Sequence, residues 1–280
     1  MNFNFEYELI DSGGFQRIER FGSFVLARPC PQAHWKRVVT DIALDAEFIK
    51  KGEKGTWNIL NPELPEAWEI QVGTAKAIIK LSPNSQVGIF PEQQENWEWL
   101  NKTITTAEQP LKILNTFAYT GMATLNSSTN SNEVTHVDGA KSAINWAKKN
   151  AESSNLQQNK IRWICDDVIQ FMEKEIRRGN TYDGIIMDPP AFGRGGKREW
   201  KIERDLPLMM QLVPQILSPN PAFVILTCHA SKLLEKKNLG NYLNRLHAFA
   251  GRTPELRDLN ILSSQGNALP SSFGARIYNL

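Results

Sequence analysis

The chain has 280 residues, of which 41% are hydrophobic and 22% charged, and its formal net charge is +2. This length suffices for one large domain or two small ones, and the composition is that of an ordinary globular protein. A strong nucleic-acid binder is often more basic, so RNA binding would have to depend on a local patch of charge. No window approaches the roughly 20 apolar residues of a membrane span.

The cysteines and the amino terminus indicate the compartment. Cys30, Cys165 and Cys228 are far apart and form neither a metal-ligand spacing nor an even-numbered disulfide framework. Residues 1–6 lack the basic and apolar regions of a secretory signal. We therefore expect a cytoplasmic protein with no membrane segment and no bound metal. The oligomeric state is left open by the sequence.

Residues 1–90 alternate short apolar and polar stretches with turn signals, which is typical of a small, mainly β domain. Tyr7–Ile10 leads into turn residues at 11–14, and the alternation resumes over 15–29, which predicts a hairpin. Further strands are expected around Trp57 and over 68–72 and 77–81. We interpret this part as a substrate-recognition domain.

The pattern changes over residues 91–280, where apolar runs of strand length alternate with helical periodicity. Helices are expected over 93–109, 140–151, 168–178 and 239–250. Five strands are expected over 111–117, 134–138, 161–165, 183–188 and 222–228. Strands separated by amphipathic helices predict an α/β fold with a parallel sheet covered on both faces. Such sheets bind ligands at the carboxyl ends of their strands, where the strand order reverses.

The residues after the first three strands are candidates for binding a nucleoside. Asn115–Gly121 follows the first strand, and its glycine lets a ligand approach the backbone, although an ordinary turn is the alternative. Asp138 ends the second strand and can accept both ribose hydroxyls, or cap the helix near Ala140. Of Asp166 and Asp167, after the third strand, one can accept an adenine amino group while the other caps the next helix. Asp166 is our choice for the ligand.

The fourth strand ends in Asp188-Pro189-Pro190-Ala191-Phe192. Consecutive prolines hold the backbone extended and remove two N–H donors, so their carbonyls can point at a substrate. A carboxylate, rigid carbonyls and an aromatic ring suit a flat heterocycle with an exocyclic amine, whereas a simple turn rarely needs all three. Near the end of the fifth strand, Cys228 is either a nucleophile or a small buried apolar residue.

A basic segment follows the two prolines. Its basic side chains are Arg194, Lys197, Arg198, Lys201 and Arg204. They can bind RNA phosphates, and we choose Arg194, Lys197 and Arg198 as substrate-binding residues. Acidic residues at 199, 203 and 205 interleave with them, so a solvated face with local ion pairs is the alternative. Arg28, together with basic residues at 34, 36 and 37, forms a second, weaker basic group.

Taken together, these strand ends resemble the class I methyltransferases that use S-adenosylmethionine. The closer resemblance is to bacterial large-subunit ribosomal RNA methyltransferases of the 5-methylcytosine type and their relatives. These share a turn like Phe117–Gly121, an Asp-Pro-Pro-x-Phe segment like Asp188–Phe192, and an upstream stretch like Gly88–Gln93. The resemblance covers nearly the whole chain. It implies a Rossmann-like sheet preceded by a small β domain, S-adenosylmethionine as cofactor, and ribosomal RNA as partner.

The resemblance also implies roles for residues. Ala118–Gly121 would approach the methionine part of the cofactor, Asp138 would hold the ribose hydroxyls, and Asp166 would meet the adenine amine. Asp188 would lie near the transferred methyl group. The implied cofactor-binding residues are Phe90, Gln93, Asn115, Phe117, Ala118, Tyr119, Thr120, Gly121, Asp138, Gly139, Asp166, Asp167 and Asp188. The implied catalytic residues are Asp188, Pro189, Pro190, Phe192 and Cys228.

Two target atoms are compatible with these residues. Methylation of cytosine C5 requires a thiolate to add to the ring first, and Cys228 is placed where the resembled enzymes have that cysteine. A guanine nitrogen needs positioning but no covalent step. Phe192 stands one position later than the aromatic residue of amino-methylating enzymes, which weakens a direct transfer to an exocyclic amine. In either case the base must leave its stack, and Phe192 is the candidate for holding it.

Other functions compete with RNA methylation. A nicotinamide-dependent oxidoreductase is disfavoured because Gly-x-Gly-x-x-Gly is absent from the first turn. A non-catalytic RNA-binding or assembly module that keeps the cofactor pocket is an alternative, as is a methyltransferase with a small-molecule or protein substrate. Resembled enzymes with an RNA-binding PUA domain carry it before the β domain, and this sequence has no room for one. RNA capture is therefore expected to use other surfaces.

Overall fold

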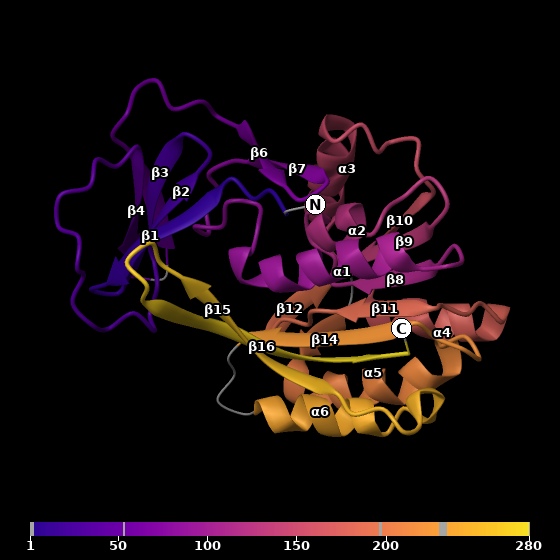
Figure 1. Cartoon of the computed structure of the whole chain (residues 1–280). Coiled ribbons are helices and arrows are strands. Elements are labelled where there is room, and N and C mark those ends of the chain that lie inside the picture. The colour runs from indigo at the N-terminus through magenta and orange to yellow at the C-terminus, as the bar shows by residue number, and fades with distance from the viewer. Residues whose placement is uncertain (1–2, 53, 196–197, 230–233, 280) are drawn as a thin grey trace. The chain divides into compact units, whose positions relative to one another are not determined.

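The computed structural model describes residues 3–52, 54–195, 198–229 and 234–279 (Figure 1). The chain forms two compact units, one of residues 1–94 with 260–271 and one of residues 95–259 with 272–280. The sequence predicts one change of domain near residue 90, whereas in the structure the chain also returns to the first unit over 260–271. Within the described ranges, no helix has both the length and the apolar character needed to cross a membrane.

The first unit is built from strands, as its alternating pattern predicts. A five-stranded sheet has the order β1-β2-β3-β4-β5, in which β3 and β4 are parallel and the other neighbours antiparallel. A separate hairpin pairs β6 with β7. The strands are β1 (Tyr7–Gly13), β2 (Gln16–Phe21), β3 (Phe24–Pro29), β4 (Ala46–Lys51), β5 (Lys54–Ile59), β6 (Trp68–Val72) and β7 (Ala75–Ile79). The predicted hairpin and the three further strands are confirmed, but the run predicted over 15–29 divides into β2 and β3, and β4 is a further addition.

A buried ion pair stabilises this five-stranded sheet. Arg28 donates from Nε and Nη2 to the two carboxylate oxygens of Glu19, at 2.7 and 2.8 Å, and both side chains are buried. The Tyr7 hydroxyl donates to the same carboxylate at 3.0 Å. Such bidentate pairing is what allows two charges to stay out of water. The interpretation of Arg28 as part of a surface basic group is therefore wrong, because its charge is neutralised inside the unit.

The second unit is built on a seven-stranded sheet of order β10-β9-β8-β11-β14-β16-β15. The first five of these strands run parallel to their neighbours, and β16 is antiparallel to β14. The strands are β8 (Lys112–Thr116), β9 (Glu133–Asp138), β10 (Ile161–Cys165), β11 (Gly184–Met187), β14 (Phe223–His229), β15 (Glu255–Leu262) and β16 (Ala268–Tyr278). All five strands predicted for this part are confirmed, and the fold is Rossmann-like α/β.

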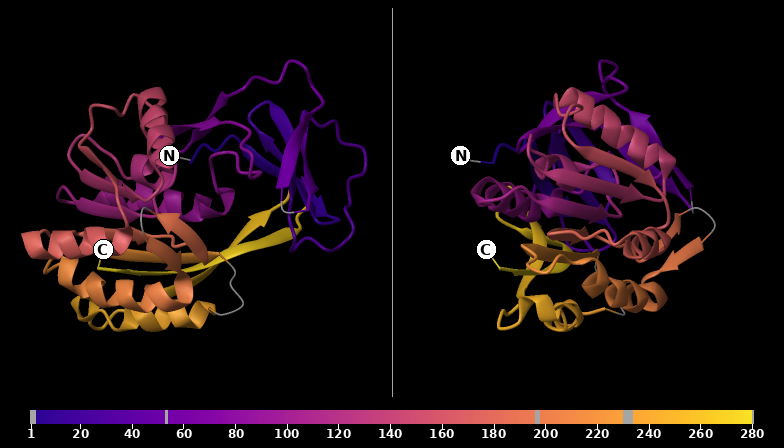
Figure 2. Two further views of the ribbon diagram at one scale, coloured as in Figure 1. Left: turned by 180° about the vertical axis from the view of Figure 1, so that it is seen from behind. Right: turned by 90° about the vertical axis from the view of Figure 1, so that its right-hand side faces the viewer.

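Helices cover both faces of this sheet: α1, α2 and α3 lie on one face and α4, α5 and α6 on the other (Figure 1, Figure 2). Successive strand residues point to opposite faces, so Ile113 packs with Leu100 of α1, whereas Leu114 packs into the core under α4 and α5. The helices are η1 (Pro91–Gln93), α1 (Gln94–Thr106), α2 (Met122–Asn126), α3 (Lys141–Ser153), α4 (Val168–Arg178), α5 (Ile202–Ile216), α6 (Lys236–Asn244) and η2 (His247–Phe249).

Two hairpins depart from the predicted pattern. The basic segment after the prolines forms β12 (Phe192–Gly195) and β13 (Arg198–Lys201), which pair antiparallel. At the other end, the helical face predicted over 239–250 stops with α6 at Asn244, and β15 and β16 then complete the sheet. The sheet is therefore mixed rather than wholly parallel. A short connection can join antiparallel strands, whereas parallel strands need a crossover.

Candidate active site

The order of the strands defines a switch point between β8 and β11. From β8 the chain moves outward to β9 and β10, then returns to β11 on the other side of β8. Doubly wound sheets bind ligands in the crevice outside the carboxyl ends of the strands at such a point. Phe117–Gly121 follows β8 and Asp188–Phe192 follows β11. The two segments singled out in the sequence therefore flank the same crevice.

The turn after β8 has an unusual backbone. Phe117, Tyr119 and Gly121 have φ values of 53°, 49° and 89°, a region that residues other than glycine rarely adopt. A Cβ on Gly121 would come within 3.1 Å of the Ala147 Cβ on α3, so a side chain there would be both strained and crowded. The Ala118 N–H donates to the Val137 carbonyl at 3.1 Å. This turn is thus held in a strained form at the switch point.

Asp138 fixes the turn from the neighbouring strand. Its Oδ2 accepts the Tyr119 N–H and its Oδ1 accepts the Ala140 N–H, both at 2.8 Å. Burial raises the pKa of Asp138, and these two N–H donors oppose that rise. Asp138 does not cap α3, whose N-cap is Ala140. A carboxylate has about four acceptor sites, so two are left for ribose hydroxyls. The residues therefore fit a nucleoside-containing cofactor.

The structure separates the two aspartates after β10. The Asp167 carboxylate accepts the Gln170 N–H at 3.0 Å and is the N-cap of α4. Asp166 accepts the Asp167 N–H at 3.0 Å and pairs with Lys174 Nζ at 2.5 Å. Asp167 is therefore the aspartate of the two that caps the helix, as the sequence allowed, and its place among the implied cofactor-binding residues stays a prediction. Asp166 stays the candidate for the adenine amine.

After β11, the Asp-Pro-Pro segment is tied to its surroundings. The Thr227 hydroxyl on β14 donates to Asp188 Oδ1. The Pro190 carbonyl accepts the Trp200 indole N–H at 2.7 Å. The sequence predicts that this carbonyl points at a substrate, whereas in the structure it binds a side chain of the protein. Pro189 is buried, and Phe192 is 53% exposed. A carboxylate and an accessible aromatic ring are thus available beside the crevice.

Cys228 has surroundings that do not suit a nucleophile. It is 1% exposed and belongs to the apolar core formed with α4, α5 and α6. Burial raises the pKa of its thiol to about 12, with the carboxylates of Asp188 and Glu203 adding to the rise. Because the thiolate is the reacting form, these surroundings argue for the alternative that the sequence left open, a small buried apolar residue.

The remaining predicted cofactor residues fall into three groups. Asn115 is buried and donates to Thr124 Oγ1 at 2.9 Å, so its amide supports α2 rather than reaching the crevice. The Thr120 and Gly139 carbonyls also have protein partners, at 2.9 Å from Asn150 Nδ2 and 3.9 Å from Cys165 Sγ respectively. The other two, at positions 90 and 93, belong to the first unit, and their part in cofactor binding stays a prediction. They are Phe90, the N-cap of η1, and Gln93, its last residue.

The predicted RNA-binding residues lie at the β12–β13 hairpin. Arg194 and Arg198 are on its two strands, and Lys197 lies outside the described residues. Two further basic residues of the segment have local partners: Lys201 lies 3.2 Å from Glu199, and Arg204 donates to Asp205. Lys201 and Arg204 therefore agree with the alternative interpretation, a solvated face with local ion pairs. Across the described ranges, no cluster of three or more His, Cys, Asp or Glu side chains could hold a metal.

Two residues at the crevice were not predicted. Thr227 stands one position before Cys228, and a strand's two-residue period allows only one of the two to face Asp188. This two-residue period was the feature of the sequence that could have predicted Thr227 at the site. Trp200 lies within the basic segment, between Arg198 and Lys201, and nothing in the sequence connects it to Pro190 ten residues earlier.

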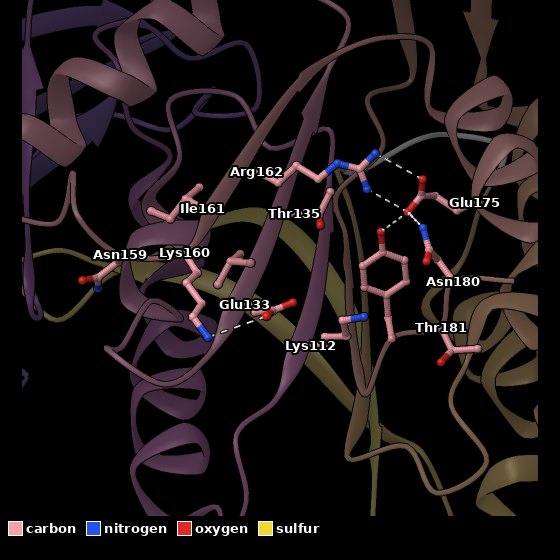
Figure 3. Close-up of a pocket in the computed structure, with 12 residues that line it drawn as sticks. Lys112, Glu133, Thr135, Asn159, Lys160, Ile161, Arg162, Glu175, Asn180 and Thr181 are labelled. Atoms are coloured by element: carbon pink, nitrogen blue, oxygen red, sulfur yellow. Dashed lines mark hydrogen bonds and ion pairs between the residues drawn. The ribbon is translucent and has the colours of Figure 1, made fainter. Parts of the chain in front are cut away.

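A cavity of about 500 Å³ lies at the opposite, amino-terminal edge of the same sheet (Figure 3). Several of the polar groups at this edge donate to the buried carboxylate of Glu175, whereas Lys160 and Glu133 pair with each other. The donors are Arg162, Arg178, Asn180 and Tyr182, at 2.7–3.0 Å in their shortest contacts. Burial would raise the pKa of Glu175, but these hydrogen bonds lower it to about 2. This network joins α4 to the strands.

The fold and the crevice define an α/β enzyme that binds a nucleoside-containing cofactor. A profile of the S-adenosylmethionine-dependent methyltransferase family matches residues 49–240, which is more than half of the chain. The chain therefore belongs to the S-adenosylmethionine-dependent methyltransferases, and S-adenosylmethionine is its cofactor.

Known proteins similar to this chain include a SAM-dependent methyltransferase from Agrobacterium tumefaciens. Its structure covers 99% of this chain and 91% of its own, with 35% identity and a TM-score of 0.92. Ribosomal RNA large subunit methyltransferase I of Aeromonas salmonicida is 26% identical over 229 residues, 80% of this chain and 56% of its own length. Ribosomal RNA large subunit methyltransferase K/L of Syntrophotalea carbinolica is 27% identical over 162 residues, 57% and 22% of the two lengths. The chain thus spans about half or less of these curated relatives.

Proposed function

We propose that this methyltransferase acts on a base of large-subunit ribosomal RNA. The observation that carries the proposal is the meeting of the cofactor turn Phe117–Gly121 and the segment Asp188–Phe192 at one switch point. The exposed ring of Phe192 offers a stacking surface for a base taken out of its helix. The names of the curated relatives from Aeromonas and Syntrophotalea supply the substrate class.

We further propose a nitrogen as the methylated atom. Carbon C5 of cytosine becomes reactive only after a thiolate adds to the ring. Cys228 is buried with a pKa of about 12, which disfavours that thiolate. A base nitrogen can attack the methyl group directly as its N–H proton is removed, so no covalent adduct with the enzyme is needed and positioning supplies most of the rate enhancement.

The residues of the chain then divide the work. S-adenosylmethionine, when bound, supplies a methyl group on a sulfonium centre. Asp138 holds the ribose hydroxyls with its spare acceptor sites. Asp188, kept in place by the Thr227 hydroxyl, accepts a hydrogen bond from the target N–H and takes up the proton that this nitrogen loses. Phe192 stacks against the base.

The test combines nucleoside analysis with a matched pair of variants. Mass spectrometry of ribosomal RNA nucleosides, with and without the gene, is expected to show one N-methylated nucleoside missing from the deletion strain. Asp188→Asn should lower kcat by about 10²- to 10⁴-fold, because a positioned acid–base group contributes on that scale. Asp183→Asn changes the same residue type at the amino end of the same strand, where the carboxylate accepts the Lys112 N–H.

The outcomes are distinct. Asp183→Asn should keep kcat within about twofold, since its amide oxygen can still accept that N–H. An unchanged set of methylated nucleosides, together with no methyl transfer to ribosomal RNA in vitro, would overturn the proposed substrate. A missing 5-methylcytidine would overturn the nitrogen acceptor and leave the RNA substrate standing.

A further inference from the structure

Trp200 connects the two loops that flank the switch point. Its indole Nε1–H donates to the Pro190 carbonyl at 2.7 Å. Its ring makes an edge-to-face contact with Phe117, with centroids 4.7 Å apart and planes at 62°. The side chain is 5% exposed. One residue therefore contacts the Asp-Pro-Pro segment after β11 and the cofactor turn after β8.

Both segments that Trp200 contacts have a backbone whose conformation needs support from other residues. Phe117 is in the left-handed region at φ 53°, a conformation that persists only when its surroundings enforce it. Pro189 and Pro190 have no N–H groups, so no backbone donors of their own can anchor the segment. Burial of an indole N–H also demands an acceptor, which here is the Pro190 carbonyl. Trp200 therefore supports both loops, through its hydrogen bond to Pro190 and its ring contact with Phe117.

The β12–β13 hairpin delivers Trp200 to this position. The chain leaves Phe192, turns, and returns so that Trp200 pairs with Gly193. The Ile202 N–H then donates to the Ala191 carbonyl at 3.1 Å, and the Lys201 N–H donates to Asp205 at 2.8 Å. The first bond ties the hairpin to the Asp-Pro-Pro segment, and the second ties it to the start of α5. The hairpin is thus a brace for the site as well as the place of the basic residues.

We propose that Trp200 is a positioning residue that sets the separation between the bound cofactor's methyl group and the target base. The proposal rests on the proposed function for the identity of the target. A substitution that keeps an aromatic ring against Phe117 and removes the bond to Pro190 should leave the turn that binds the cofactor supported, so it should affect turnover more than cofactor affinity. Misplacement of reacting groups by about 1 Å can cost about 100-fold in rate.

Trp200→Phe removes the N–H donor and keeps an aromatic ring against Phe117. We expect kcat to fall by about 10- to 100-fold while the Kd for S-adenosylmethionine stays within about threefold. Amide hydrogen exchange should rise in peptides covering 188–204. Trp99→Phe is the matched control, because Trp99 makes a similar edge-to-face contact with Phe223 on the other face of the sheet, at 5.4 Å. It should change neither quantity. Trp200→Tyr repeats the test if Trp200→Phe does not fold.

The results separate the two proposals. Unchanged exchange over 188–204 in a folded Trp200 variant would overturn the role of Trp200, whatever the substrate. Parallel loss of kcat and cofactor affinity, or an equal loss in Trp99→Phe, would reduce Trp200 to a core residue and overturn the proposal too. Wild-type protein that binds S-adenosylmethionine but methylates no ribosomal RNA would instead overturn the proposed function.

Discussion

The partner of each strand-end aspartate decides what that side chain can bind. Asp166 is paired with Lys174, and Asp167 caps α4. Asp188 accepts from Thr227. Asp138 accepts two backbone N–H groups, which hold its carboxylate in place without the neutralising charge that Lys174 supplies to Asp166. It therefore keeps the charge and the acceptor sites that two ribose hydroxyls require.

Asp138→Asn should weaken cofactor binding. The amide loses the charge and presents an NH₂ group to one of the two backbone donors, so the turn and the ribose site are both disturbed. We expect the Kd for S-adenosylmethionine to rise about 10- to 100-fold, since hydrogen bonds to a charged group contribute about 1.5–3 kcal/mol. Isothermal titration calorimetry measures this. Asp183→Asn is the control, because its amide oxygen can still accept the Lys112 N–H at the amino-terminal edge of the sheet. An unchanged Kd in Asp138→Asn would remove Asp138 from the site.

Cys228→Ala tests the covalent route at the same scale. If the thiol only packs, turnover stays within about twofold and stability falls by about 1 kcal/mol from the lost buried volume. Iodoacetamide at neutral pH should modify exposed Cys165 and leave buried Cys30 and Cys228 unmodified in the folded protein. A loss of turnover by about 10³-fold, with cofactor binding intact, would instead identify Cys228 as the nucleophile.

At the scale of elements, the periodicity of the apolar residues determined which strands could be predicted. Apolar runs located β8, β9, β11 and β14, because strands buried on both faces carry a continuous apolar signal, and the edge strand β10, which is only part-buried, carries a weaker one. The β12–β13 hairpin was not predicted, since its polar, glycine-containing strands resemble a loop. The sequence also left open which side of β14 Cys228 faces. Along β14, Thr227 points to Asp188, so Cys228 must point into the core, and only the three-dimensional register settles which of the two faces the site.

The Glu175 network joins elements that the chain order separates. Glu175 is fully buried on α4, and it binds Arg162 from β10 and Tyr182 just before β11. Arg178 and Asn180 complete the set. A carboxylate with this many donors stays ionised despite its burial. It therefore stabilises the amino-terminal edge of the sheet, away from the catalytic edge.

Glu175→Gln should lower the free energy of unfolding by about 2 kcal/mol, because Arg162 and Arg178 lose the negative charge that they pair with. Both arginines are half-exposed. The folded pKa of about 2 lies below the unfolded value of about 4.3. The unfolded state thus binds more protons in this window, and the stabilisation is complete above it and lost as the pH falls toward 2. Urea unfolding from pH 7 to pH 3 should show the difference from wild type shrinking. Exposed Glu173→Gln on the same helix is the control; a constant difference would exclude the carboxylate's role.

At the scale of the whole molecule, charge is almost balanced. A net charge of +2 over 280 residues produces no strong general attraction to RNA. For the proposed RNA substrate, phosphate binding would therefore be local, and the β12–β13 hairpin combines a basic sequence with a position next to the Asp-Pro-Pro segment. Arg194 and Arg198 lie on its strands, whereas Lys201 is already paired with Glu199.

RNA affinity should therefore fall with rising salt, with a slope that reports few phosphate contacts. For single-stranded RNA, each lost contact should reduce the slope of log affinity against log salt by about 0.7. Arg194→Ala combined with Arg198→Ala is expected to lower the slope by about twice that amount, measured by fluorescence anisotropy on a ribosomal RNA fragment. Lys201→Ala should leave the slope unchanged, because Glu199 neutralises that charge before RNA arrives. Equal slopes in all three proteins would move phosphate recognition away from the hairpin, to a surface that the charge pattern of this segment does not reveal.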